Sequence, residues 1–411
     1  MYERIVITGM GTVNPLGNSV SESWENAING VSGLAPITQF DASNHLVKYA
    51  CEVKDFDATQ YLEAREIRRR DRFEILAAAA VSQALEQSGL EINDSNAGRI
   101  GTVVSAAIGG LISLEEGVQK VHGRGPRTVS PFLIPMLMPN GAAGLVGIDH
   151  GPKGPAFSVA SACASGQDGI GMAWMMLRSG SIDVAIAGAS EAVISATGVA
   201  AFDRLGAMSR RSPEEGTPQP FDKNRDGLVM GEGSGAIILE TESHAKARGA
   251  EILAELAGYG ASADAFHITA PSDTGAGGSK AIQVALQEAG ANAGDVDYIN
   301  AHGTGTQLND KSETLAVKSA LGEAAYSTPI SSTKSMTGHM MGATGALETI
   351  FCVQAIRENR IPPTINYLEA DPDCDLDNVP NEGRDHEVDL AITNAFGFGG
   401  HNAVLAIRNS I

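Results

Sequence analysis

Short apolar runs alternate with longer segments of helical periodicity along almost the whole chain. The first half suggests strands at 4–8, 99–106, 156–161 and 182–187, a helix at 73–88 that Gly89 stops, and a second helix that ends at Leu177. Runs that are apolar throughout are typical of strands that helices cover on both faces. The alternation therefore predicts an α/β fold with buried, nearly continuous apolar strands.

The second half repeats this order. It suggests strands at 296–300, 330–333 and 390–394, with helices at 311–321 and 342–356. The segments CASGQDGIGMAWMMLRSGSI and MGATGALETIFCVQAIRENRI are both glycine-opened helices that end in a basic residue and a turn. We infer a weak internal duplication with a border near 246–251, which divides the chain into halves 1–250 and 251–411.

Composition fits one compact globular protein. The chain has 411 residues, of which 43% are apolar and 48 are glycine, so it can bury a large core. The start, MYERIVITGMG, carries no basic or long apolar leader, and the most apolar stretch, 132–148, is broken by Pro135, Pro139 and Asn140. We therefore expect neither a signal peptide nor a membrane span, and a cytoplasmic location.

The net charge of −20 makes nucleic acid and anionic lipid poor candidate partners. One basic stretch, EAREIRRRDRF, stands out against it. Its arginines have the i, i+3, i+4, i+7 spacing that makes one stripe on a helix: Arg65, Arg68, Arg69 and Arg72. Such a stripe is most often a solvated face, but it could also steer an acidic protein partner.

Of the four cysteines, Cys163 is the one whose sequence surroundings suggest a reactive position. The four cysteines, at 51, 163, 352 and 374, are far apart and predict neither a zinc site nor a disulfide. Cys163 lies in SVASACASGQDGIG, where a strand ends and a helix begins, so helix N–H groups would favour its thiolate form. The alternative is a buried cysteine that acts as a small apolar residue. The other three cysteines receive no role.

Two of the nine histidines lie in glycine-rich loops at the edge of the sheet where ligands bind. His302 follows a strand in INAHGTGTQLND, and His339 precedes a helix in SSTKSMTGHMMGATGA. Either could be an ordinary surface or core histidine. Lys334 and Glu348 flank His339, and a buried pair between them would hold its loop whether or not it also serves the chemistry.

The segment NAFGFGGHNAVLAI, 394–407, reads as a glycine turn between two strands, with Phe396 and Phe398 interleaved. Its backbone could approach a ligand closely and supply one oxyanion donor beside the N–H of Cys163. A plain hairpin is the alternative. The stretch GMGTVNPLG lacks the third glycine of a dinucleotide fingerprint, and no G-x-S-x-G, Walker or H-E-x-x-H motif occurs.

Together these motifs resemble the elongating β-ketoacyl-acyl carrier protein synthases, the condensing enzymes of dissociated fatty-acid synthesis. The resemblance runs through VITGMGTVNPLG, ACASG, FDKNRDGLVMGEGSGAIILE, NAHGTGTQLND, SSTKSMTGHMMGATGA and NAFGFGGHN. It implies a thiolase-like fold of two βαβαβαββ halves in a five-layered α-β-α-β-α arrangement, usually as a homodimer.

The resemblance also implies roles for individual residues. Cys163 would be the nucleophile, His302 and His339 the catalytic histidines, and Lys334 with Glu348 their supporting pair. Phe398 would be the gate and supply the second oxyanion N–H. The residues implied in substrate binding are Ile108 for the acyl chain, Thr304 and Thr306 for the phosphopantetheine arm, and Phe202 and Phe396.

The implied reaction is a ping-pong condensation. An acyl group moves from acyl carrier protein to Cys163, and malonyl-carrier protein then loses CO2 to give an enolate that attacks it. The four arginines would dock the carrier. The chemistry needs no metal or organic cofactor. The sequence does not decide whether the protein binds a structural monovalent cation.

Several departures from the family pattern and several rivals bear on this reading. Asn309, Asn14 and SAAIGG at 105–110 replace common residues and touch only packing and pocket shape. A thiolase would need a second cysteine beyond Cys374, and an initiating enzyme would use a Cys–His–Asn set. A non-catalytic chain-length-factor subunit would lack Cys163. A ketosynthase of a specialised polyketide or lipid pathway remains an alternative that the sequence does not separate.

Overall fold

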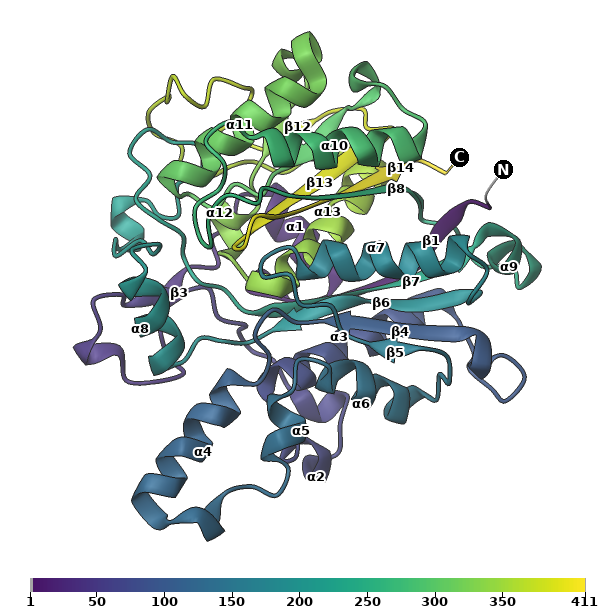
Figure 1. The fold of residues 1–411 in the computed structure, drawn as a ribbon, viewed down its shortest axis with the longest axis vertical. Coiled ribbons are helices and arrows are strands. Elements are labelled where there is room, and N and C mark those ends of the chain that lie inside the picture. Colours follow the sequence, from purple (N-terminus) through teal and green to yellow (C-terminus); the bar gives the residue numbers. More distant parts are fainter. Residues whose placement is uncertain (1–2, 411) are drawn as a thin grey trace.

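The computed structural model describes residues 3–410. Ten strands are hydrogen-bonded in the order β10-β9-β13-β14-β8-β1-β7-β6-β4-β5 (Figure 1). Their bounds are β1 Ile5–Val13, β4 Ile100–Ser105, β5 Ala156–Phe157, β6 Val184–Glu191, β7 Gly233–Thr241, β8 Ala254–Ala263, β9 Tyr298–Asn300, β10 Ile330–Ser331, β13 Leu390–Gly397 and β14 His401–Arg408. Two small ribbons add β2 Ala35–Pro36 with β3 Tyr49–Ala50, and β11 Arg360–Ile361 with β12 Arg384–Asp385.

The strand order is the same in both halves of the chain. From the outside inward, the first half runs β5-β4-β6-β7-β1 and the second half runs β10-β9-β13-β14-β8, so each half places its third, second, fourth, fifth and first strand in that order. β1 and β8 meet antiparallel over only two residue pairs, Val6 with Glu255 and Ile7 with Ala254. The molecule is therefore two five-stranded sheets joined at one edge, as an internal duplication predicts.

Helices form three layers around these two sheets (Figure 1). α7 (Ser165–Arg178) and α13 (Thr344–Glu358) lie between the sheets. α3 (Arg72–Ser88) and α6 (Gly141–His150) cover the outside of the first sheet, and α10 (Ala276–Ala289) and α11 (Gln307–Leu321) cover the second. α13 is buried around almost its whole circumference, as a central layer requires. The expected five-layered α-β-α-β-α arrangement is confirmed.

The remaining α-helices are α1 Val20–Ile28, α2 Ala64–Ile67, α4 Leu111–Arg124, α5 Leu133–Leu137, α8 Ala196–Arg204, α9 Glu242–Ala247 and α12 Lys334–Thr337. All four residues of α12 are buried. α4 and α5 project from the body next to α2 and α6 (Figure 1). Within residues 3–410, no helix has the length and apolarity that a bilayer crossing requires.

The G-x-G pair in GMG serves packing. On β1, a Cβ at Gly11 would lie 2.1 Å from the Ala80 oxygen of α3. On β8, the G-x-G pair of GYG does the same job, because a Cβ at Gly260 would lie 2.1 Å from the Ala281 oxygen of α10. The first strand of each half thus packs closely against the first long helix of that half. This close packing explains the two glycines of GMG, which resemble the start of a dinucleotide fingerprint.

Two sequence predictions of local structure are wrong. The arginine stretch does not form one helix: α2 ends at Ile67, and α3 starts at Arg72 behind a capping box of Asp71 and Glu74. The strand expected at 156–161 stops at Phe157. The residues after it form the approach to Cys163 instead of pairing in the sheet.

Candidate active site

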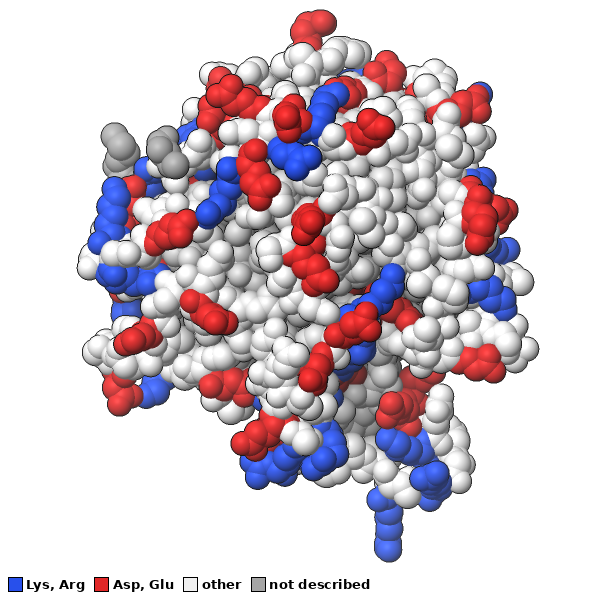
Figure 2. All heavy atoms as spheres, turned by 180° about the vertical axis from the view of Figure 1, so that it is seen from behind, with Lys and Arg blue, Asp and Glu red and all other residues white. Residues whose placement is uncertain are grey.

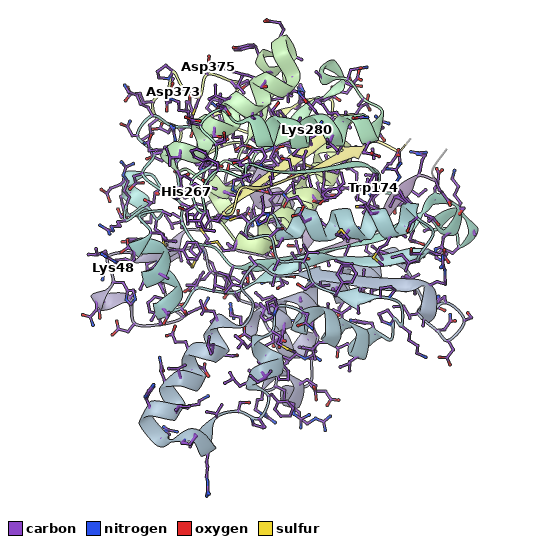
Figure 3. All side chains as sticks on the ribbon, in the orientation of Figure 1. Lys48, Trp174, His267, Lys280, Asp373 and Asp375 are labelled. Carbon is purple, nitrogen blue, oxygen red and sulfur yellow. The ribbon has the colours of Figure 1, made fainter. Side chains whose placement is uncertain are left out.

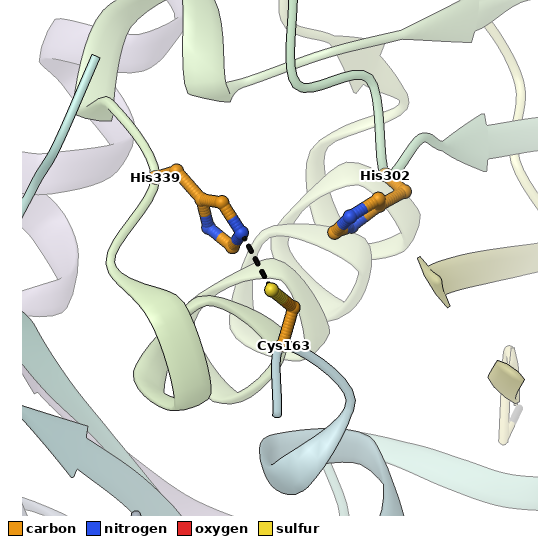
Figure 4. Close-up of side chains that lie close together, drawn as sticks. All are labelled: Cys163, His302 and His339. Carbon is orange, nitrogen blue, oxygen red and sulfur yellow. Dashed lines mark hydrogen bonds between the residues drawn. The ribbon is translucent and has the colours of Figure 1, made fainter. Parts of the chain in front are cut away.

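Three side chains from distant segments converge at one point (Figure 4). Cys163 lies two residues before α7, His302 two residues after β9, and His339 between α12 and α13. One ligand atom from each lies within 4.8 Å of the others, and His339 Nε2 is 3.0 Å from Cys163 Sγ. The two imidazole rings stand edge to face with centroids 5.4 Å apart. The structure thus brings together the three residues singled out in the sequence.

Cys163 sits on a tight turn at residues 161–165, which we call the nucleophile turn. Ala162, just before it, has a φ of +52°, a left-handed conformation that is uncommon for a residue with a side chain. The Ser165 hydroxyl bridges the turn: it accepts from the Ser161 N–H at 2.9 Å and donates to the Ala162 carbonyl at 2.6 Å. The turn presents the sulfur to the cavity at the start of α7.

The environment of the sulfur corrects one expectation. Burial raises the pKa of Cys163 to about 11, and the opposing effects of the Lys334 charge and of the backbone N–H groups of Phe398 and Cys163 are smaller. The resting group is therefore a thiol and not the thiolate expected from the helix N-terminus. The same two N–H groups face the sulfur, where an oxyanion hole needs its donors.

Lys334 and Glu348 form a buried ion pair. The Lys334 ammonium lies 2.6 Å from Glu348 Oε1, both side chains are 1% exposed, and the ammonium also donates to the Ala301 carbonyl at 3.3 Å. Burial, followed by the Lys334 charge, holds the pKa of His302 and of His339 well below the usual range. Both imidazoles are therefore neutral at neutral pH, and each can donate an N–H without carrying a charge.

Buried side chains that the sequence did not single out orient the two histidines. Glu313 of α11 accepts the backbone N–H of His302 at 2.8 Å and of Gly303 at 2.6 Å. The Thr344 hydroxyl lies 3.1 Å from His339 Nδ1 and can donate or accept, so His339 can hold its proton on either nitrogen. Glu313 is an acidic residue on the buried face of a helix, which is the one signal in the sequence that could have marked it.

Glu191 is a second buried carboxylate missed in the sequence. At the end of β6, it accepts the backbone N–H groups of Ala107, Ile108 and Gly109 at 2.7, 3.1 and 2.8 Å. It also accepts the N–H of Gly342 at 3.2 Å. Glu191 thus joins the loop after β4 to the segment between His339 and α13.

The hairpin of β13 and β14 brings its glycine turn against Cys163. A Cβ at Gly397 would lie 3.0 Å from the Cys163 nitrogen, so a side chain there would press on the nucleophile turn. The Phe398 ring stacks on Phe202 with centroids 6.5 Å apart, and Phe396 lies edge-on to His302 at 6.1 Å.

A cavity of about 270 Å³ opens onto the three central residues. The residues predicted to bind substrate that line it are Phe202, Thr304, Thr306 and Phe396, and the predicted gate Phe398 also lines it. The hydroxyls of Thr304 and Thr306 lie 3.0 Å apart. Ile108 lies outside this cavity, in an apolar cluster that also holds Phe202 and Leu111. Phe202 belongs both to the lining of the cavity and to the apolar cluster of Ile108.

The predicted arginines divide into two groups. Arg65 and Arg69 each pair with Glu66, at 3.1 and 3.4 Å, and Arg68 is exposed. The half-buried Arg69 also lies over the Phe132 ring, with its guanidinium carbon 4.8 Å from the ring centroid. Arg72 instead makes two hydrogen bonds, at 2.8 and 2.6 Å, to the fully buried Glu232. Basic side chains gather around the α4–α5 projection at the bottom of Figure 2, in a surface that is otherwise rich in acidic groups.

Buried oxygen atoms near the ion pair offer ligands of the kind that a hard cation takes. Asn300 Oδ1 and Thr393 Oγ1 belong to residues paired across β9 and β13, and Asn394 Oδ1 comes next along β13. These atoms and Glu348 Oε2 have no hydrogen-bond partner among the described residues. Amide, hydroxyl and carboxylate oxygens of this kind would fit a monovalent cation.

The chain is similar to known proteins over its whole length. Residues 2–245 match the family described as "Beta-ketoacyl synthase, N-terminal domain", and residues 253–368 match "Beta-ketoacyl synthase, C-terminal domain". A Staphylococcus aureus (strain N315) protein named 3-oxoacyl-[acyl-carrier-protein] synthase 2 is 45% identical over 406 residues, which cover 99% of this chain and 98% of that protein.

Solved structures agree with this match. The ishigamide ketosynthase/chain length factor superposes with a TM-score of 0.94 at 35% identity, with both chains fully covered. AntDE:AntF, described as a type II PKS acyl-carrier protein in complex with its ketosynthase, gives 0.92 at 33% identity, again over the full length of both chains.

Proposed function

The chain belongs to the β-ketoacyl synthase family, and from that premise we propose how its residues carry out the reaction. It is a 3-oxoacyl-acyl carrier protein synthase, an acyltransferase that elongates fatty acids by condensation. The observation that carries the mechanism is the 3.0 Å contact of Cys163 Sγ with His339 Nε2, with a second neutral histidine across the same cavity.

In the first half-reaction, Cys163 attacks the carbonyl carbon of the acyl thioester. Because its thiol is protonated at rest, His339 Nε2 takes the proton as the sulfur attacks. The N–H groups of Cys163 and Phe398 stabilise the tetrahedral oxyanion. The carbon–sulfur bond to the phosphopantetheine arm then breaks, and the departing sulfur receives the proton from His339. The products are acyl-Cys163 and free carrier thiol.

In the second half-reaction, malonyl-carrier protein loses CO2, and the electron pair of the broken bond forms an enolate on the thioester. His302 and His339 each donate an N–H to the enolate oxygen, and their lowered pKa values keep them neutral donors. The enolate carbon attacks the acyl-Cys163 carbonyl, the Cys163 sulfur leaves, and it takes a proton from solvent. The product is a 3-ketoacyl-carrier protein that is two carbons longer.

Lys334 and Glu348 position this machinery. The Lys334 ammonium is bonded to the carbonyl of Ala301, next to His302, and its charge helps to keep both imidazoles neutral. A cation held by Asn300, Thr393 and Asn394 would be structural and would take no part in the chemical steps.

The carrier protein is the partner of this family, and we propose Arg65, Arg68 and Arg69 as its docking residues. Arg65 and Arg68 are exposed, and Arg69 is half-buried over the Phe132 ring. The ion pairs of Arg65 and Arg69 are surface contacts with Glu66, so the charges of the docking residues can meet an acidic surface. Arg72 is assigned a structural role because it pairs with buried Glu232. Thr304 and Thr306 line the cavity where the phosphopantetheine arm would enter. Ile108 would shape the far end of the acyl pocket once Phe398 swings away from Phe202.

We also propose a homodimer. Exposed apolar side chains gather on and beside the α4–α5 projection, at Phe132, Ile134, Met138 and Ile148, and β5 is an open edge of the sheet. A second copy of the chain would cover both. The halves 1–250 and 251–411 and the cytoplasmic location remain predictions.

Intact mass after incubation with a medium-chain acyl-carrier protein tests the mechanism, with peptide mapping of the adduct. We expect one acyl group on Cys163 in the wild type and none in Cys163→Ser, which keeps the shape of the side chain but weakens its nucleophilicity. An adduct elsewhere would overturn the assignment of the nucleophile. No adduct with any acyl thioester in a folded sample would favour the non-catalytic subunit. Preferential use of polyketide-type acyl groups would favour the specialised pathway.

A further inference from the structure

Asp168, which the mechanism does not use, joins the nucleophile turn to the other half of the molecule. It lies in the first turn of α7, five residues after Cys163. Its Oδ2 accepts the Ser161 hydroxyl at 2.5 Å, and its Oδ1 accepts the Tyr259 phenol at 2.7 Å. Ser161 is the first residue of the nucleophile turn, and Tyr259 belongs to β8 of the second half.

Tyr259 is a fixed donor in this bridge. Its ring packs directly over α7, where a Cβ at Gly171 would lie 2.5 Å from ring atoms. Burial and the charge of Asp168 raise the pKa of Tyr259, so its hydroxyl keeps its proton and donates it to the carboxylate. Further along α7, Trp174 Nε1 donates to the Leu256 carbonyl of β8 at 2.8 Å (Figure 3 labels Trp174). α7 is thus held to β8 at two points.

The turn that Asp168 anchors needs such support. Ala162 is held in a left-handed conformation, which costs energy and persists only where the surroundings fix it. Ser161 is fixed at two groups, its N–H by Ser165 and its hydroxyl by Asp168. The next two residues then place the Cys163 sulfur and the Cys163 N–H, which is one of the two oxyanion donors.

We propose that Asp168 and Tyr259 are positioning residues for acyl transfer to Cys163 and not for decarboxylation. This inference rests on the proposed function. The decarboxylation donors, His302 and His339, are fixed by other groups: Glu313 at the His302 backbone and Thr344 at the His339 ring. Loosening the turn therefore displaces the nucleophile and one oxyanion donor while the enolate site stays in place.

Tyr259→Phe is the primary test because it removes one oxygen and keeps the ring over Gly171. Tyr61→Phe is its matched control, since the half-buried Tyr61 hydroxyl pairs only with the Gln83 side chain, at 3.1 Å. Asp168→Asn and Ser161→Ala test the other two members of the bridge. Acylation of Cys163 by acyl-carrier protein is followed by quenched intact mass, and malonyl decarboxylation is measured with each change combined with Cys163→Ala.

We expect Tyr259→Phe and Asp168→Asn to slow acylation roughly tenfold to a hundredfold, since displacing a reacting group by about 1 Å can cost that much. Decarboxylation should stay within about twofold, and Tyr61→Phe should change neither rate. Equal slowing of both half-reactions would show a general structural role, and unchanged acylation would show no role, so either result would overturn the proposal. Failure of the wild type to acylate would instead overturn the proposed function.

Discussion

Replacing Lys334 by methionine leaves the Glu348 carboxylate buried without its cation. In the wild type, the two groups lie 2.6 Å apart and are each 1% exposed. Removing one partner of such a pair typically costs about 3–5 kcal/mol, because the remaining charge is neither solvated nor paired. We expect a loss of this size in the free energy of unfolding, and we expect it to depend on pH.

The sign of that dependence follows from Glu348. Burial raises its pKa from 4.5 to about 7 in the folded wild type, and Lys334 provides the main opposing effects. A carboxyl group whose folded-state pKa is raised loses stability as pH rises from its unfolded value to its folded value. In Lys334→Met, that range extends above pH 7. The gap from wild type should therefore widen by up to about 1.4 kcal/mol per pH unit, or about 2 kcal/mol between pH 7 and pH 8.5.

Urea unfolding followed by circular dichroism at pH 6, 7 and 8.5 measures this gap. The double variant Lys334→Met with Glu348→Gln is the matched control, because it removes the carboxyl group that pairs with Lys334 and keeps the buried Glu313, whose pKa the Lys334 charge also lowers. It should recover most of the stability, and its gap from wild type should widen much less with pH than that of Lys334→Met. A gap that stays constant with pH, or that is largest at pH 6, would refute the reasoning.

Three further predictions concern the active site and the proposed docking residues. Cys163→Ala should abolish condensation yet leave malonyl decarboxylation, assayed as release of CO2, because His302 and His339 remain. Gly397→Ala should slow Cys163 acylation by roughly a hundredfold or more, since its Cβ would crowd the Cys163 nitrogen and disturb an oxyanion donor; an unchanged burst would place the oxyanion hole elsewhere. Charge reversal at the docking arginines Arg65, Arg68 and Arg69 should raise the KM for carrier protein at low salt and make that KM less dependent on salt. An unchanged KM would show that these arginines only form a solvated surface. Arg72→Ala should lower the melting temperature instead.

Local signals in the sequence predicted the long elements well. The helix expected at 73–88 is α3, Arg72–Ser88, and Gly89 ends it in a left-handed conformation with a φ of +60°. The sequence also contained such a signal where the prediction of one arginine helix failed. Asp71 and Glu74 form the capping box that starts α3 within the arginine stretch. Had this box been given more weight than the spacing of the arginines, it would have predicted a new helix starting at Arg72.

The hydrogen-bond partners of three carboxylates in and around the site could not be predicted from the sequence. Glu191, Glu313 and Asp168 are bonded to groups of segments that only the fold brings near them: the backbone of residues 107–109 and 342, the backbone of residues 302–303, and the hydroxyl of Tyr259. The protonation of Cys163 has the same origin. A helix start is visible in sequence, but the extent of burial that raises the thiol pKa is a property of the whole molecule.

Because both halves have the same strand order, the positions of the active-site residues in the two halves can be compared. Cys163 and His339 occupy corresponding places, each in the segment that follows the third strand of its half and precedes the central helix, α7 in one case and α13 in the other. The two halves thus carry different functional groups at the same position, a nucleophile in one and its proposed proton acceptor in the other. The reaction centre combines Cys163 of the first half with His302 and His339 of the second, so neither half holds a complete active site of its own.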